Sequence, residues 1–270
     1  MKRLFFLLLL LFATQISAQT DFFVIGDSNT SQRITTAPLV CDNKYSYTQS
    51  LYKSNELMVG EITSISYYHV GGWFNSGVVK VYLKETTQSS LSSFVSLQNS
   101  IEVFSDTVIL SNGWITFDFH TPYEYSGNNN LVITMIKEGF TTQSNHFFKT
   151  RNANSSTRCA ANHTTPYNIN SNPNYSQILN ETPIVKVGII PDEEHCYQPF
   201  NLRVDSVSSD LAIISWDNFW QEGSFVGIAC KKDTESQWTI IQEGVSGTTY
   251  TITGLESHSN YQIKLWTICP

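Results

Sequence analysis

The chain has 270 residues, of which 41% are hydrophobic and only 14% are charged. Its 23 acidic side chains outnumber its 16 basic ones, and this surplus of negative charge argues against nucleic acid as a partner. The low charged fraction, together with abundant Ser, Thr, Asn, Gly and Tyr, favours a sheet-rich extracellular protein over a helical one.

The first residues have the pattern of a secretory signal peptide. Lys2 and Arg3 precede an unbroken apolar run over residues 4–12, and small residues follow at Ser17 and Ala18. The run is too short for a transmembrane helix, which needs about 20 residues, so we assign residues 1–18 to a cleaved signal peptide. Its removal leaves 14 basic and 23 acidic side chains, a formal charge of −9. We expect a secreted or cell-surface protein with no membrane span.

Alternating hydrophobic residues predict many half-buried strands up to residue 190. In residues 78–83 and 115–119, apolar side chains occupy every second position, which is the period of a strand with one buried face. The best helix candidate, residues 49–58, is too short and too polar to support a helical layer. The expected fold class is therefore all-β, a sandwich or barrel. Further apolar runs, separated by Gly, Asn, Ser and Pro turns, are residues 131–136, 146–149 and 184–190.

A second pattern begins after a short charged linker, residues 191–195. The strand pattern of residues 211–216 ends at Trp216, and Gly254-Leu255 leads after five residues to Tyr261. This arrangement closely resembles a fibronectin type III domain over residues 196–270, an immunoglobulin-like β-sandwich in which Trp216 would be the core indole and Tyr261 the corner tyrosine. The other apolar runs of this unit are residues 225–231, 238–241, 250–253 and 261–268.

The resemblance leaves the last strand of such a domain, strand G, without a counterpart. Strands A, B, C, C′, E and F can be placed, but an unpaired strand F would expose backbone donors and acceptors, which folded proteins avoid. We expect either that the natural chain continues past Pro270, which is the favoured alternative, or that another chain donates the strand as in fimbrial assemblies.

Five cysteines occur in a chain that is predicted to be exported, where disulfides persist. The odd count implies an unpaired buried thiol or a partner outside this sequence. Cys230 is the best candidate for the buried thiol, because it alternates with Val226 and Ile228 onto one strand face. In the sandwich that the resemblance implies, Cys196 and Cys269 would lie at the same pole, which makes them a candidate disulfide pair.

A second resemblance is carried by a series of segments before residue 190. It begins with Ile25-Gly26-Asp27 and continues through residues 45–52, 60–65, 79–87, 113–114, 121–127 and 130–132. Together these segments resemble a jelly-roll module of secreted Bacteroidetes proteins, which would occupy residues 19–190. In that group the module is commonly followed by fibronectin type III repeats, and the proteins are adhesin-like, in the style of the cleaved adhesin domains of gingipains. The resemblance implies a jelly-roll-like β-sandwich with a binding role, without specifying the ligand.

One segment also resembles the GDS block of SGNH-type esterases, with Ser28 as the nucleophile. Asp192 and His195 have that family's D-x-x-H spacing and would supply the orienting carboxylate and the base. The chain lacks the family's G-x-N-D block and the helices of its α/β fold, and a motif counts only in its structural setting. We therefore expect a turn at Ser28, no catalytic residues and no enzyme activity.

The sequence gives little indication of a metal site or a nucleotide-binding site. The six histidines show no zinc-binding spacing, and the cysteines form no C-x-x-C pair. Asp21, Asp27 and Asn29 are hard oxygen donors close in sequence, which suits a structural calcium ion, although an Asx turn is the simpler interpretation. No Gly-rich phosphate loop with its lysine occurs. We expect no cofactor, with structural calcium as the alternative.

Aromatic residues in polar loops are the best sequence candidates for ligand contact. Trp73 and Phe74 lie between Gly71 and Gly77, and Phe219 and Trp220 follow Trp216. Exposed rings stack on sugar faces or anchor a protein partner, whereas the alternative is ordinary packing over the core edge. The sequence thus predicts an adhesin-like module that binds a glycan or a surface protein, with the second domain as a spacer. A non-catalytic front end of a longer secreted hydrolase or protease is the second hypothesis.

Overall fold

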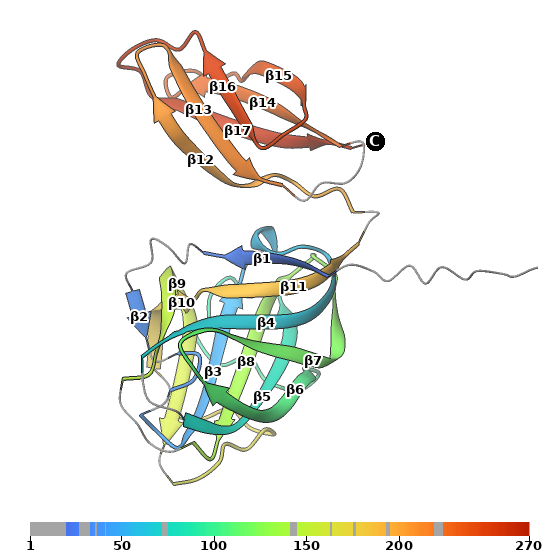
Figure 1. Ribbon diagram of the computed structural model, residues 1–270, viewed down its shortest axis with the longest axis vertical. Coiled ribbons are helices and arrows are strands. Elements are labelled where there is room, and N and C mark those ends of the chain that lie inside the picture. The colour runs from blue at the N-terminus through green and yellow to red at the C-terminus, as the bar shows by residue number, and fades with distance from the viewer. Residues whose placement is uncertain are drawn as a thin grey trace, which may run out of the picture.

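The computed structural model describes residues 20–26, 33–35, 37–40, 42–71, 75–140, 145–162, 164–174, 177–192, 195–218 and 224–269. These residues form an all-β protein whose antiparallel strands build two sandwich-like units (Figure 1). Within them there is no α-helix, only one 3₁₀ turn, η1 (Ser54–Glu56), and no helix that could cross a membrane. The predicted signal peptide lies outside the described residues.

The first unit contains the strands β1 (Asp21–Ile25), β2 (Arg33–Thr35), β3 (Tyr45–Tyr52), β4 (Gly60–Val70), β5 (Asn75–Thr86), β6 (Ile101–Leu110), β7 (Gly113–Tyr125), β8 (Asn130–Glu138), β9 (Phe147–Asn162), β10 (Gln177–Pro183) and β11 (Val185–Pro191). They form one folded-over sheet with the order β1-β11-β4-β9-β3-β8-β5-β6. β7 also pairs with β4, and β2 and β10 pair with β9. In Figure 1, β1, β11, β4 and β7 cross in front of β3, β8 and β5, which gives a front and a back layer. The long β9 pairs with strands of both layers.

The main hydrophobic core lies between these layers. Ile65 and Tyr67 of β4 and Phe117 of β7 face Val81 and Leu83 of β5, and all five side chains are fully buried. Each alternates along its strand with a side chain on the opposite face, so the predicted strands at residues 78–83 and 115–119 are confirmed. Full burial of one such apolar side chain contributes about 1.5–3 kcal/mol to stability.

A long connection, residues 87–100, covers the outer face of the back layer. Leu91 and Val95 of this connection pack on Leu51 of β3 and Val132 of β8. The side chain of Gln49 fastens it, because its Nε2 donates to the Val95 carbonyl and its Oε1 accepts from the Val95 N–H, both at 2.7 Å. The outer side of β3 and β8 is therefore a second buried surface.

The helix candidate at residues 49–58 is wrong. Its first four residues belong to β3, which is hydrogen-bonded to β8 on one edge and to β9 on the other. The polar residues at its start are buried: Gln49 bonds to Val95, and Ser50 Oγ lies 3.4 Å from Thr157 Oγ1. Pairing on both edges and burial on both faces override the local polarity.

The second unit is built from two three-stranded sheets, β12-β13-β16 and β15-β14-β17. This pairing agrees with the sandwich expected from the sequence, in which these strands are A, B, E and C′, C, F. The second unit's strands are β12 (Phe200–Val207), β13 (Leu211–Asp217), β14 (Phe225–Lys232), β15 (Thr239–Val245), β16 (Thr249–Thr253) and β17 (Tyr261–Ile268).

Trp216 occupies the centre of the second sandwich, where it packs with Ile214, Val226, Ile228 and Ile252. At its edge the hydroxyl of Tyr261 accepts a hydrogen bond from the Glu256 N–H at 3.0 Å, the contact expected of a corner tyrosine. Both roles match the sequence expectation.

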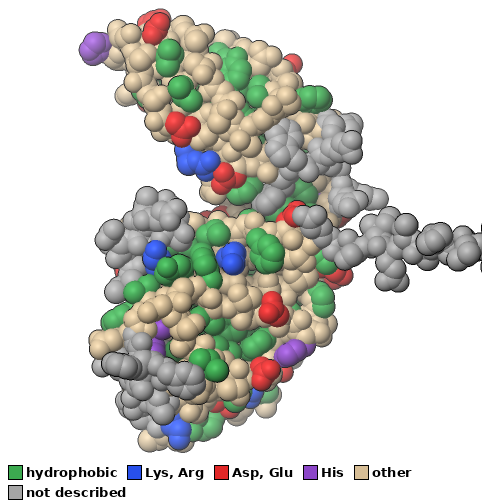
Figure 2. Space-filling model, viewed as in Figure 1, with side chains coloured by type: hydrophobic (Ala, Val, Ile, Leu, Met, Phe, Trp, Pro, Cys, Tyr) green, Lys and Arg blue, Asp and Glu red, His purple; other side chains and the backbone are tan. Residues whose placement is uncertain are grey.

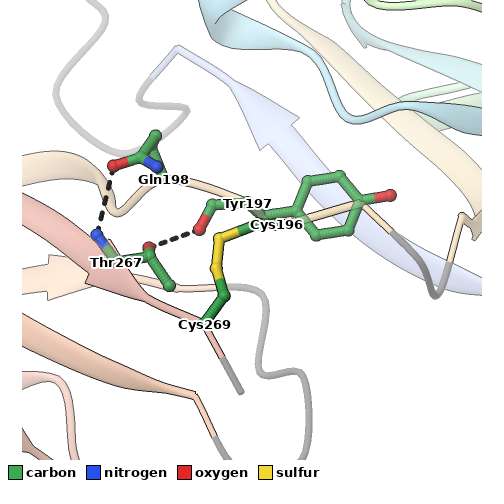
Figure 3. The surroundings of a disulfide bond; sticks show 5 residues. All are labelled: Cys196, Tyr197, Gln198, Thr267 and Cys269. Atoms are coloured by element: carbon green, nitrogen blue, oxygen red, sulfur yellow. Dashed lines mark hydrogen bonds between the residues drawn. A yellow bond between two sulfur atoms is a disulfide. The ribbon is translucent and has the colours of Figure 1, made fainter.

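The structure joins Cys196 to Cys269 by a disulfide bond, with a Cα to Cα distance of 6.1 Å (Figure 3). This is the predicted pair. Cys230 is buried and free, also as predicted, and Cys159 is a second buried free thiol. Burial raises the pKa of both thiols, which makes them poor nucleophiles.

Candidate functional site

The outer face of the front layer has a floor of small side chains. Ser64 and Ser66 of β4 and Gly188 of β11 point outward between strand positions that face the core. A Cβ added at Gly188 would lie only 2.9 Å from a ring carbon of Phe22, so the Phe22 ring rests over the glycine. Large side chains can therefore lie flat across this floor.

Five side chains cross this face in a continuous row, which we call the aromatic-lysine row: Phe22, Lys186, Trp114, Tyr68 and Lys149. The Nζ of Lys186 lies 5.8 Å from the Phe22 ring centre and 5.1 Å from the Trp114 ring. The Trp114 and Tyr68 rings meet edge to face with centres 5.4 Å apart. The Nζ of Lys149 lies 4.3 Å from the Tyr68 ring centre, so aromatic and cation-π contacts link all five.

Strand register assembles the row from five separate strands. Phe22 of β1 pairs with Gly188 of β11, and Tyr68 of β4 pairs with Trp114 of β7. Lys186 of β11 pairs with Ser66 of β4, whose small side chain leaves room for the lysine to reach Trp114. Residues paired across antiparallel strands share a face, so the row follows from the sheet order.

Figure 2 shows hydrophobic and basic side chains interspersed on this face over β1, β11 and β4. Phe22 is 61% exposed, whereas Trp114, Tyr68 and both lysines are half-buried. Flat rings can stack on the apolar face of a sugar, and lysine ammonium groups donate hydrogen bonds to hydroxyl, carboxylate or sulfate oxygens. The row can therefore bind a ligand that combines flat apolar faces with anionic groups.

Most of the residues singled out in the sequence lie outside the described part of the chain. Asp21 is described at the start of β1, where it pairs with Ile189. Because its two proposed partners are not described, the calcium site stays a prediction; the described residues hold no group of three His, Cys, Asp or Glu suited to a metal. The residues outside the described part are Asp27, Ser28, Asn29, Trp73, Phe74, Phe219 and Trp220.

The Asp192 and His195 pair of the esterase hypothesis forms a backbone turn. The His195 N–H donates to the Asp192 carbonyl at 3.1 Å, and the His195 ring packs against Tyr197 with ring centres 4.9 Å apart. These contacts give the D-x-x-H spacing a structural role in the segment between the units.

A cleft of about 440 Å³ lies beside β1, between η1 and residues 198–202. Arg151 lines it, but both of its terminal nitrogens bond to the Glu56 carboxylate, one of them at 2.9 Å. Burial opposes ionisation of Glu56, yet the bonds from Arg151 and the Lys53 N–H hold the pKa of Glu56 below its usual value. The Glu56 carboxylate thus neutralises the Arg151 guanidinium within the cleft. The cleft is therefore a weaker candidate site for an anionic ligand than the aromatic-lysine row.

The row could not be found from the sequence, because each member occupies an ordinary strand position. In the sequence, Trp114 stands out only through the jelly-roll resemblance. Several strands carry an aromatic residue or a lysine at a position that faces outward. This pattern indicates a shared surface only once the order of the strands in the sheet is known.

The fold and this face define an all-β protein of two sandwiches with an exposed aromatic-lysine row on the first. No protein-family model matches the chain, and a comparison with curated proteins finds no match.

Proposed function

We propose that the chain is an exported, adhesin-like binding protein, and not an enzyme, that recognises a glycan at the cell surface or in the medium. The aromatic-lysine row on the first sandwich is the contact surface, and the second sandwich is a spacer. The observation that supports this function is the unbroken contact between three aromatic rings and two lysines on a solvent-facing sheet.

The composition of the row favours an acidic glycan. Rings that rest on a small-residue floor offer flat surfaces for sugar rings, and their positions are fixed by contact with neighbouring side chains. Lys186 and Lys149 place positive charge beside those rings in a chain whose overall charge is negative. A polysaccharide with carboxylate or sulfate groups satisfies both features, whereas a surface protein is the alternative ligand.

The test compares acidic and neutral polysaccharides by isothermal titration with the purified full chain. We expect Trp114→Ala and Lys186→Ala each to weaken binding of an acidic polysaccharide about tenfold or more, which is about 1.4 kcal/mol. Raising the salt concentration from about 0.05 to 0.5 M should also weaken binding, because exposed lysine charges are screened.

The second sandwich supplies a matched control. Lys231 lies 5.2 Å from the ring of Trp238, so it repeats the lysine and tryptophan contact away from the row. Trp238→Ala should leave binding unchanged. Equal losses in Trp238→Ala and Trp114→Ala, or binding of a protein ligand that ignores Trp114, would contradict the proposal.

A further inference from the structure

The connection between β6 and β7 contains the only Asn-Gly pair in the sequence, Asn112-Gly113. An asparagine that precedes a glycine can react with its own backbone, because a glycine has no β-carbon to hinder the approach of its nitrogen to the side-chain carbon Cγ. Asn112 is exposed, and Gly113 is the first residue of β7. Water therefore has access to the side chain that would react.

The surroundings of Gly113 leave its backbone open. Its φ is 103°, in the region that residues with a side chain rarely adopt. A Cβ added at Gly113 would have no described atom within 4 Å apart from those of its chain neighbours. Neither a side chain of its own nor a packed neighbour covers this side of the residue.

The Asn112 side chain is held in place by Gly71. The Gly71 N–H donates to Asn112 Oδ1 at 2.6 Å. This hydrogen bond draws electron density from Cγ toward Oδ1, which makes Cγ a better electrophile. When a nucleophile adds to Cγ, Oδ1 becomes negatively charged, and the same N–H stabilises that charge as a donor of an oxyanion hole does.

The backbone on both sides of Asn112 is fixed as well. The Nδ1 of His69 lies 2.9 Å from the Ser111 carbonyl oxygen, and Gly113 pairs with His69 in the register of β4 and β7. Both neighbours of Asn112 thus contact the same residue of β4. This restraint keeps the reacting atoms close and reduces the entropy that is lost when a ring forms.

We propose that Asn112 is a site of spontaneous deamidation in the folded protein. The Gly113 nitrogen bonds to Asn112 Cγ, the Cγ–Nδ2 bond breaks, and the proton of the Gly113 nitrogen passes through water to the departing ammonia. The product of this step is a succinimide ring. One water molecule then opens the ring at either carbonyl, which leaves aspartate or isoaspartate at position 112. The reaction consumes water, releases ammonia and requires no cofactor.

Both products change the start of β7. Each of them adds a negative charge, and isoaspartate also adds a methylene group to the backbone between Ser111 and Gly113. The change lies just before Trp114, in the strand that supplies this member of the aromatic-lysine row. The inference is independent of the glycan proposal, since the reaction requires no ligand.

The test follows the folded full chain during incubation in a mildly alkaline buffer. Samples are digested, and mass spectrometry measures the fraction of the Asn112 peptide in which a carboxyl has replaced the amide. We expect Asn112 to convert about tenfold or more faster than Asn99 in the same samples. Asn99 is also an exposed asparagine in a turn, but it precedes Ser100, whose β-carbon hinders ring closure.

Two variants test the role of the Gly113 nitrogen. Gly113→Ala places a methyl group beside that nitrogen and should slow the conversion of Asn112 about tenfold or more. Gly139→Ala is the matched control, because Gly139 also has a positive φ, 76°, and open surroundings. It carries a similar backbone strain and should leave the rate unchanged. Urea midpoints of both variants show whether the two chains remain equally folded.

Three results would overturn the inference. The first is conversion of Asn112 no faster than that of Asn99, and the second is an equal rate in Gly113→Ala and Gly139→Ala. The third is a folded chain in which Asn112 reacts about tenfold more slowly than in the urea-unfolded chain, because the fold would then protect the residue.

Discussion

At the scale of single residues, the clearest unexplained feature is a pair of buried histidines, His69 and His146. The Nδ1 of His69 lies 2.9 Å from the Ser111 carbonyl, which only accepts, so this nitrogen carries the proton. Its Nε2 then accepts from His146 Nδ1 at 3.0 Å. The two rings are stacked, and the shared hydrogen bond needs one of the two facing nitrogens to be without a proton, so the two imidazoles cannot both be charged.

Burial is the main cause that lowers the pKa of both histidines. His146 adds to the effect on His69; the Lys137 ammonium lowers the pKa of His146 further, while Asp42 opposes it. A folded-state pKa below the unfolded value means that the unfolded chain binds more protons. Stability is therefore fully present above the unfolded value of about 6.5, and is lost as the pH falls through 6.5 toward the folded values.

This predicts a lower urea midpoint for the first sandwich at about pH 5.5 than at about pH 7.5. The double variant His69→Gln, His146→Gln should remove most of that difference, whereas His120→Gln, a substitution at an exposed histidine, should keep it. A wild-type midpoint that is the same at both pH values would contradict the lowered pKa of the two histidines.

At the scale of elements, the Gln49 side chain holds the connection 87–100 on the sheet. It makes two hydrogen bonds to the Val95 backbone, as a neighbouring strand would. Gln49→Leu preserves the size and the strand propensity but leaves the Val95 N–H and C=O without this partner. We expect unfolding free energy to fall by about 1–3 kcal/mol, the cost of a buried polar group left unpaired.

The measurement for Gln49→Leu is urea unfolding together with limited proteolysis of residues 87–100, which should become cleavable in the variant. Gln98→Leu is the control, because Gln98 lies in the same connection and is exposed. A loss of stability that is the same in both variants would show that the Gln49 hydrogen bonds contribute nothing specific.

The elements also show what the sequence can and cannot predict. Strands with apolar residues at every second position, such as β5 and β7, were predicted, because a half-buried strand imposes that period. Part of β3 was the best helix candidate, since the sequence does not show that its polar residues Gln49 and Ser50 bond to threonines of the neighbouring strands β8 and β9. The aromatic-lysine row could not be predicted, because Lys186 and Trp114 are far apart in sequence and meet only through strand register.

At the scale of the whole molecule, the segment between the sandwiches is held at both ends. The Tyr197 hydroxyl lies 2.6 Å from the Val59 carbonyl and 2.9 Å from the Asp192 carbonyl. Burial raises the pKa of Tyr197 to about 12, so it keeps its donor proton at neutral pH. The adjacent Cys196 is bonded to Cys269 of the second sandwich, so one short segment contacts both units.

The Cys196–Cys269 disulfide should stabilise the second sandwich selectively. It closes a loop with a sequence separation of 73 residues, and its removal is expected to cost about 2–4 kcal/mol through the greater freedom of the unfolded chain. In calorimetry, the double variant Cys196→Ser, Cys269→Ser should lower one transition and leave that of the first sandwich in place. The only cysteine among the first unit's described residues, Cys159, is free, so a reducing agent should reproduce the effect. A single transition that shifts as a whole would instead mean that the two sandwiches unfold together.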